Sequence, residues 1–251
     1  MVGMTGLEIT LLAVAAFCTS ALTAVVGAGG GTLLLALMLQ GMPPTAAIPV
    51  HGCVQLAANS TRTWLLRAHL NWPIIWRFSV LIPLGVVLGL WLFQGLGPEI
   101  VQMLIGGFVL LSLIAGRLRG LSARTLPLWV FLPVGLITGA LNVIVGVIAP
   151  MLGALMSYTP LRKEAVVGTL GWFGVIGNLT KIAGFSAIGF SFAAYGPLIL
   201  AMVPAAILGS CSGRHLLSRV DEALFRRGFQ IMLVALALKL ILIDGFAKLL
   251  G

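Results

Sequence analysis

Long apolar stretches, separated by short polar or turn-forming segments, fill the chain from one end to the other. A helix needs about 20 mostly apolar residues to cross a bilayer. Eight stretches approach that length, namely residues 7–26, 46–66, 74–96, 100–118, 128–148, 165–185, 192–212 and 225–250. The pattern therefore predicts an all-α integral membrane protein with about eight transmembrane helices. Two shorter apolar runs, 32–39 and 151–156, cannot cross and are expected to be half-helices or continuations of long tilted helices.

Polar and glycine positions inside these stretches recur at a fixed spacing. A shift of 119 residues places Gly27 on Gly146, Ala46 on Ala165, Gly52 on Gly171, Asn59 on Asn178, Thr61 on Thr180 and Arg62 on Lys181. Such self-similarity indicates two similar halves, a first membrane repeat at 1–120 and a second at 121–251, within a single membrane domain. The basic segment 117–124 would form the seam between them. With about four crossings in each half, the tandem repeats would be parallel rather than inverted.

Composition indicates that lipid surrounds the chain. Hydrophobic residues make up 60% of the sequence and charged residues only 8%, whereas soluble domains carry about a quarter of charged residues. The formal charge of +9 would suggest nucleic acid in a soluble protein, but no soluble basic module remains beside the apolar spans. With four crossings per half, Lys and Arg divide eight to six between the two sides. This small excess favours cytoplasmic termini.

The first candidate for chemistry is a glycine-rich break after the first apolar stretch. Gly29, Gly30 and Gly31 precede Thr32 and a short apolar run. If a half-helix begins there, its N-terminus presents unpaired backbone N–H groups and positive dipole, which together bind anions. The corresponding segment of the second half is 146–150, where Pro150 could begin a matching half-helix. The alternative is that the glycines only allow close helix packing, although three in succession exceed what one packing face needs.

The second candidate is a polar stripe on the stretch that follows. His51, Gln55, Asn59 and Arg62 are four, four and three residues apart, so they share one helical face. A cation near the bilayer centre costs about 2.5–3.5 kcal/mol even on the lenient insertion scale, which makes it a functional candidate. The alternative for the basic residues is snorkelling to the headgroups. His51 could titrate near neutral pH and is a candidate proton carrier, or it is a packed core histidine.

The second half supplies a matching set. Asn178, Thr180 and Lys181 repeat the Asn-x-Thr-cation order of the first half, and Asn142 lies near the second break. Asn142 could line the same cavity or bond a neighbouring helix. The binding set expected from both halves is Gly29, Gly30, Gly31, Thr32, Gln55, Asn59, Arg62, Asn142, Asn178, Thr180 and Lys181.

No catalytic residues, metal site or cofactor are expected. The three cysteines stand alone in apolar stretches, and a His-Glu-x-x-His motif is absent. The segment Gly209-Ser210-Cys211-Ser212-Gly213 resembles a nucleophile elbow only superficially, because its middle residue is cysteine.

The glycine-rich break at Ala28–Gly31, the Pro-containing turn between Gly41 and Ala47 and the duplicated Asn-bearing span resemble the sulfite exporter TauE/SafE family over nearly the whole chain. The resemblance implies a multi-pass permease of the cytoplasmic (inner) membrane, in a family whose members export sulfite or organosulfonates such as sulfoacetate. The second half departs from that pattern. It has Gly146-Val147-Ile148-Ala149-Pro150 where the family often repeats its glycines, so the two half-sites are not expected to be equivalent.

The sequence therefore predicts a secondary transporter, an exporter of small anions such as sulfite or organosulfonates. Its expected partners are the anionic substrate and the lipid bilayer, with no nucleic acid, and a homo-oligomer stays open. Two other readings remain: an accessory membrane subunit without its own substrate, and an intramembrane enzyme.

Overall fold

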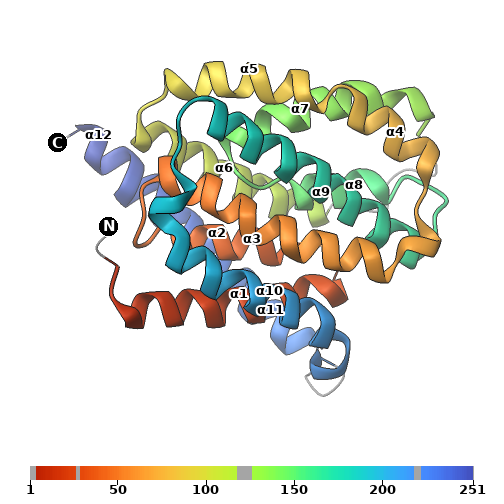
Figure 1. Ribbon diagram of the computed structural model, residues 1–251, viewed down its shortest axis with the longest axis horizontal. Helices are drawn as coiled ribbons and strands as arrows, with labels where there is room; N and C mark the ends of the chain where they lie inside the picture. The colour runs from red at the N-terminus through yellow and green to blue at the C-terminus, as the bar shows by residue number, and fades with distance from the viewer. Residues whose placement is uncertain (1–3, 27–28, 118–125, 218–221, 251) are drawn as a thin grey trace.

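The computed structural model of the chain describes residues 4–26, 29–117, 126–217 and 222–250. Every regular element in these ranges is a helix (Figure 1). The 1–120 part contains α1 (Gly6–Val26), α2 (Gly30–Met38), α3 (Pro44–Leu65), α4 (Trp72–Val80), α5 (Ile82–Gln94) and α6 (Pro98–Arg117). The remainder contains α7 (Phe131–Ile144), α8 (Ala149–Met156), α9 (Lys163–Ala187), α10 (Gly196–Leu217), α11 (Glu222–Lys239), a π-helix (Leu240–Ala247) and α12 (Lys248–Leu250). Short 3₁₀ turns at Arg67–His69, Leu128–Val130 and Phe192–Tyr195 precede α4, α7 and α10.

Each of the eight predicted stretches corresponds to one, two or three consecutive helical elements. Five segments are long and apolar enough to cross a membrane: Gly6–Ala24, Trp72–Gln94, Lys163–Ala187, Phe192–Gly213 and Gln230–Ala247. Two shorter apolar helices are Pro98–Ile114 and Leu128–Ile144. The long helix α3 is absent from both sets because its polar stripe lowers its hydropathy.

Large apolar side chains cover the outside of the helix bundle. Leu200, Trp91 and Leu7 are 75%, 74% and 69% exposed, and many other leucine, isoleucine and valine side chains are exposed along the same helices. Water would penalise such a surface, whereas lipid tails solvate it. The described structure is therefore that of an all-helical membrane protein.

The two short apolar runs form separate half-helices, α2 and α8. Each follows a glycine with positive φ, 105° at Gly29 and 78° at Gly146, a backbone conformation that other residues adopt only with strain. The first turn of α2 lies beside the middle of α3, where His51 contacts the Gly31 carbonyl. The connection after α2 then leads to the start of α3 at Pro44. Helix α2 therefore runs back along α3, opposite to α3 and to α1.

The central helices of the two halves run in opposite directions. Gly52 of α3 lies against Lys181 of α9, and Thr63 of α3 lies against Gly171 of α9. Residue numbers rise along one helix as they fall along the other, so α3 and α9 are antiparallel.

The last helices of the two halves are also antiparallel. Gly106 of α6 lies against Ala237 of α11, whereas Met103 lies against Gly245 of the following π-helix. Helices that correspond under the 119-residue shift therefore point in opposite directions. The expected parallel relation is wrong, because α2 returns the chain within the membrane and adds a reversal that a count of long apolar stretches omits.

Glycines join the outer helices in two pairs. Gly209 and Gly213 of α10 lie against the Phe17 and Ala21 carbonyls of α1, and Gly85 of α5 lies against the Leu136 carbonyl of α7. Glycine lets backbones approach closely in lipid, where packing and not the hydrophobic effect holds helices together. The two glycines of the segment that resembles a nucleophile elbow thus pack against α1, whereas Cys211 between them is exposed.

Helix directions place most basic residues at one end of the bundle. We call the end where α3, α6 and α10 finish the basic end. Arg62 near the end of α3 donates to the Thr23 carbonyl near the end of α1, so α1 also finishes there, and both α1 and α12 have their outer ends on the opposite side (Figure 1). Eight of the fifteen Lys and Arg residues occur in helix ends or connecting sequences of the basic end, namely Arg67, Arg77, Arg117, Arg162, Lys163, Arg214, Arg226 and Arg227, and three others, Arg119, Arg124 and Arg219, lie outside the described residues.

Four further basic residues divide equally between the opposite end and the interior of the bundle. Lys239 and Lys248 belong to the opposite end and pair with Asp244, at 2.8 and 3.6 Å. Arg62 and Lys181 are buried between the two ends. The expected division of the Lys and Arg residues, eight to six between the two sides, is therefore wrong, because it assumed too few reversals of chain direction. The seam segment 118–125 lies outside the described residues.

Candidate functional site

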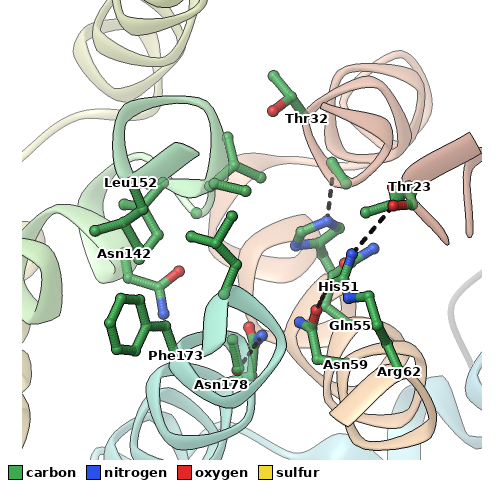
Figure 2. Close-up of a pocket in the computed structure, with 17 residues that line it drawn as sticks. Thr23, Thr32, His51, Gln55, Asn59, Arg62, Asn142, Leu152, Phe173 and Asn178 are labelled. Carbon is green, nitrogen blue, oxygen red and sulfur yellow. Dashed lines mark hydrogen bonds between the residues drawn. The ribbon is translucent and has the colours of Figure 1, made fainter. Parts of the chain in front are cut away.

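A small cavity lies where the two halves meet (Figure 2). Its volume is about 50 Å³. Its walls come from the end of α1, the first turn of α2, the polar face of α3, the break between α7 and α8, and the middle of α9. The lining residues are Thr23, Gly31, Thr32, His51, Gln55, Asn59, Arg62, Asn142, Gly146, Val147, Ile148, Ala149, Leu152, Leu170, Phe173, Gly174 and Asn178.

The polar stripe of α3 forms one wall of this cavity. His51, Gln55, Asn59 and Arg62 all line it, as expected for residues on one helical face. The His51 Nε2 atom lies 2.9 Å from the Gly31 carbonyl oxygen, and a Cβ at Gly31 would lie 3.0 Å from the Gln55 side-chain oxygen. Glycine at position 31 therefore lets α2 approach the polar face of α3.

Arg62 points inward and is 8% exposed. Its guanidinium donates to the Asn59 Oδ1 atom and, at 3.4 Å, to the Thr23 carbonyl. Within the described part of the chain its Nε atom has no hydrogen-bond partner, and no carboxylate pairs with it. Snorkelling is therefore excluded for Arg62 in this structure, which leaves a buried cation whose neighbours are neutral oxygens.

Lys181 is the corresponding cation of the second half, and it is fully buried. Its Nζ atom donates to Asn142 Oδ1 at 3.3 Å and to the Gly146 carbonyl at 3.1 Å. Asn142 in turn donates to the Gly177 carbonyl at 2.9 Å. Thr23 and Asn142 each lie 39 residues before the cation that they hold. The two cations are thus anchored in corresponding ways, yet only Arg62 lines the cavity.

Most of the expected binding residues meet at the cavity, and four do not. Gly29, Gly30, Thr180 and Lys181 are outside its lining. Gly30 packs on the Thr19 carbonyl of α1, which is the close-packing alternative. The Thr180 hydroxyl donates to the Ile176 carbonyl at 2.7 Å, and Thr180 belongs to an outer groove between α5 and α9. The expectation that Thr180 lines this cavity is therefore not met.

Several lining residues were not anticipated. Thr23 is the one polar residue among them, and the 119-residue shift that places it on Asn142 would have identified it. Val147, Ile148, Leu152, Leu170 and Phe173 form an apolar wall opposite the polar stripe. Apolar residues in an apolar chain carry no sequence signal of their own.

The lining of the cavity presents hydrogen-bond donors and one cation. A carboxylate is missing from its lining, whereas a guanidinium, three asparagine or glutamine amides from α3 and α9, and two threonine hydroxyls surround it. Asn178 uses its Nδ2 atom within α9, donating to the Gly174 carbonyl at 2.7 Å. The Thr32 Oγ1 atom has no partner among the described residues. These groups line the cavity between the two halves.

The family model described as sulfite exporter TauE/SafE matches residues 12–240, which include the whole cavity lining. The chain belongs to the sulfite exporter TauE/SafE family. No curated protein and no solved structure matches it.

Membership in the TauE/SafE family agrees with the helical structure. The chain is a multi-pass membrane protein of a transporter family, and the family's name points to sulfite or a related anion as the transported species. In this TauE/SafE protein the second break lies under two side chains of the first half. Gly146 is closed over by the Leu35 and Ile48 side chains.

Proposed function

We propose that this TauE/SafE protein is a secondary transporter that exports sulfite or a small organosulfonate across the cytoplasmic membrane. The observation that carries this proposal is the buried Arg62 guanidinium, which faces the cavity without a carboxylate partner in the described chain. A buried cation without a counter-charge is costly. A bound anion would remove that cost.

The proposed anion lies between Arg62 of α3 and Thr32 of α2, which both line the cavity. The Arg62 Nε atom and the Thr32 hydroxyl supply donors that have no partner in the described residues. The Asn59, Asn178 and Gln55 amides surround the same space, and the first turn of α2 adds its free backbone N–H groups. A volume of about 50 Å³ favours a small oxyanion such as sulfite, whereas a longer organosulfonate would require the cavity to widen.

The two halves form an inverted repeat in this proposal. Residues 1–120 and 121–251 each contribute four long helical spans and one returning half-helix, which retains eight spans in total. The antiparallel pairs α3 with α9 and α6 with α11 support an axis in the membrane plane, the arrangement in which secondary transporters bind substrate near the midplane. The cavity lies beside the middle of α3, in agreement with that position.

The basic end faces the cytoplasm in the proposed orientation, and both termini face outward. Among the described residues, eight basic residues belong to one end and two to the other, and cytoplasmic loops carry the excess of Lys and Arg. Single cysteines introduced at Ala68 of the basic end and at Gly95 of the opposite end, in a chain whose Cys18, Cys53 and Cys211 are replaced by serine, would test this in intact cells. An impermeant thiol reagent should label Gly95→Cys and not Ala68→Cys, and the reverse labelling would overturn the orientation.

Flux through the purified chain tests the proposed transport. Proteoliposomes containing the chain alone should release labelled sulfite faster than protein-free liposomes, and Arg62→Gln should abolish the difference. Arg67→Gln is the matched control, because Arg67 is exposed beside the Trp64 ring at the basic end, and it should transport normally. Normal flux in Arg62→Gln would remove the proposed site. Absence of flux in the wild-type chain would favour the accessory-subunit alternative.

A further inference from the structure

Lys181 is a buried cation that the proposed anion site leaves unused. It is fully buried, and both of its hydrogen-bond acceptors are neutral oxygens. No carboxylate in the described ranges pairs with it; the ion pairs there join Asp244 to Lys239 and Lys248. An ammonium group held in this way inside hydrocarbon is costly. Its position needs an explanation other than direct substrate contact.

Lys181 stands directly behind the cavity wall. Its two acceptors, Asn142 and Gly146, both line the cavity from the other side. The Lys181 side chain also packs against Gly52 of α3, where an added Cβ would lie 2.9 Å from its Cε atom. An anion in the cavity would therefore lie one residue layer from the ammonium and would stabilise its charge.

The two cations of the repeat differ in a way that matters for protons. Arginine stays protonated in proteins, whereas a buried lysine can release its proton and become a neutral amine. Arg62, which lines the cavity, is permanently charged, and Lys181, which does not, can change its charge. We propose that Lys181 is the protonation site that couples proton binding to anion binding, an inference that rests on the proposed function.

The surroundings of Lys181 contain two other titratable groups, both on α3. His51 and Cys53 interact with it electrostatically, while α7 and the second break contribute only the Asn142 amide and the Gly146 carbonyl. His51 uses its Nε2–H to hold the Gly31 carbonyl of α2. A charged imidazole would repel a charged Lys181, so the two groups are not charged together, and the His51 contact fixes α2 against α3.

The proposed step is a simple exchange of one proton. With the cavity empty, the Lys181 ammonium releases H⁺ to water and keeps the electron pair as a neutral amine. When an anion enters, the amine takes up one H⁺. By linkage the coupling is reciprocal, so protonation strengthens anion binding by the same factor, typically 5- to 150-fold for such coupling. Anion and proton would then move together.

Proton uptake upon anion binding tests this step. The purified full chain, in weakly buffered solution with a pH indicator, would receive methanesulfonate, a sulfonate whose charge is constant across the pH range used. The wild-type chain should take up protons as it binds and should bind more weakly as the pH rises. Lys181→Arg, which keeps the charge, should bind with one affinity at every pH and take up no protons. His51→Gln should keep the wild-type pH dependence.

Lys181→Met provides a second variant that removes the charge. It should bind about 5- to 150-fold more weakly than the wild-type chain at low pH, again without pH dependence, and its thermal unfolding reports whether it folds. Wild-type proton uptake in Lys181→Arg would overturn the inference, as would its loss in His51→Gln alone. Wild-type binding without proton uptake would overturn the inference but leave the proposed function standing. Failure of the wild-type chain to bind sulfite or methanesulfonate at any pH would overturn both.

Discussion

The two halves of the cavity are built on the same plan and differ in what they present to a ligand. Corresponding positions under the 119-residue shift pair His51 with Leu170 and Gln55 with Gly174. The first member of each pair belongs to the polar wall, whereas Leu170 belongs to the apolar wall and Gly174 packs against the Asn59 side chain. Asparagine is kept in both halves, at positions 59 and 178. The first half thus supplies the charged group and most of the hydrogen-bonding side chains of the cavity, and the second half supplies its apolar wall.

The cations show the same divergence. Arg62 opens onto the cavity, whereas Lys181 is closed off behind Asn142 and Gly146. Each cation crosses to a glycine of the other half, Arg62 to Gly171 and Lys181 to Gly52. The frame of the site is therefore symmetric, and its chemistry is not.

The largest expected effect comes from filling the space opposite Asn59. A Cβ at Gly174 would overlap the Asn59 side chain, so Gly174→Ala should push that amide away from Arg62 and leave a buried donor unsatisfied. Such a group costs about 2–3 kcal/mol, which corresponds to roughly 30- to 150-fold in anion affinity. Sulfite flux in proteoliposomes measures it. Gly107→Ala on α6, where an added Cβ meets nothing, should transport like the wild-type chain.

The two glycine-packed outer helix pairs should respond equally to an added methyl group. A Cβ at Gly135 would strike the Phe78 carbonyl, and one at Gly209 the Phe17 carbonyl. Overpacking of this kind costs about 1–3 kcal/mol, so Gly135→Ala and Gly209→Ala should both lower the unfolding temperature in detergent. Gly107→Ala should not. A loss confined to one variant would show that the two pairs are not equivalent in strength.

The two asparagines at corresponding positions, Asn59 and Asn178, should differ in their contribution to transport. Asn59 accepts a hydrogen bond from a charged group, Arg62, whereas Asn178 bonds a backbone carbonyl of its own helix. Bonds to charged groups are worth about 1.5–3 kcal/mol and neutral ones about 0.5–1.5 kcal/mol. Flux should therefore fall at least about tenfold in Asn59→Ala and only a few-fold in Asn178→Ala. Equal losses would mean that Asn178 contacts the anion as closely as Arg62 does.

The smallest expected effect is at Thr180. Its hydroxyl bonds the Ile176 carbonyl on the outer side of α9, so Thr180→Val should change sulfite flux less than twofold. The matched comparison is Thr32→Val, which removes an unpartnered hydroxyl from the cavity and should weaken flux measurably. A strong loss in Thr180→Val would return this residue to the site.

The sequence predicted the polar wall well because that wall is a local feature. Four residues on one face of one helix need only the helical period to be placed together, and the burial of Asn59 and Arg62 follows from their setting in α3. Thr180 could have been excluded on the same basis, since residues two apart, such as Asn178 and Thr180, do not share a helical face.

Other features depend on how helices cross, which no local pattern specifies. Whether Arg62 or Lys181 reaches the cavity follows from the rotation of α3 against α9, and the apolar wall has no signal in an apolar chain. The relation of the halves was missed because α2, with only nine residues, is too short to count as a span, yet it reverses the chain. That reversal inverts the direction of α3 to α7 and changes the division of the basic residues between the two ends, while a second reversal at α8 restores the expected direction of α9 to α11.

Equilibrium binding of labelled sulfite to the purified chain tests the account most directly. The wild-type protein and Arg67→Gln should bind it with the same affinity, while Arg62→Gln should bind at least about 30-fold more weakly, because the cation that faces the cavity is gone. If Arg62→Gln bound sulfite as tightly as the wild-type chain, the cavity between α3 and α9 would not be the anion site.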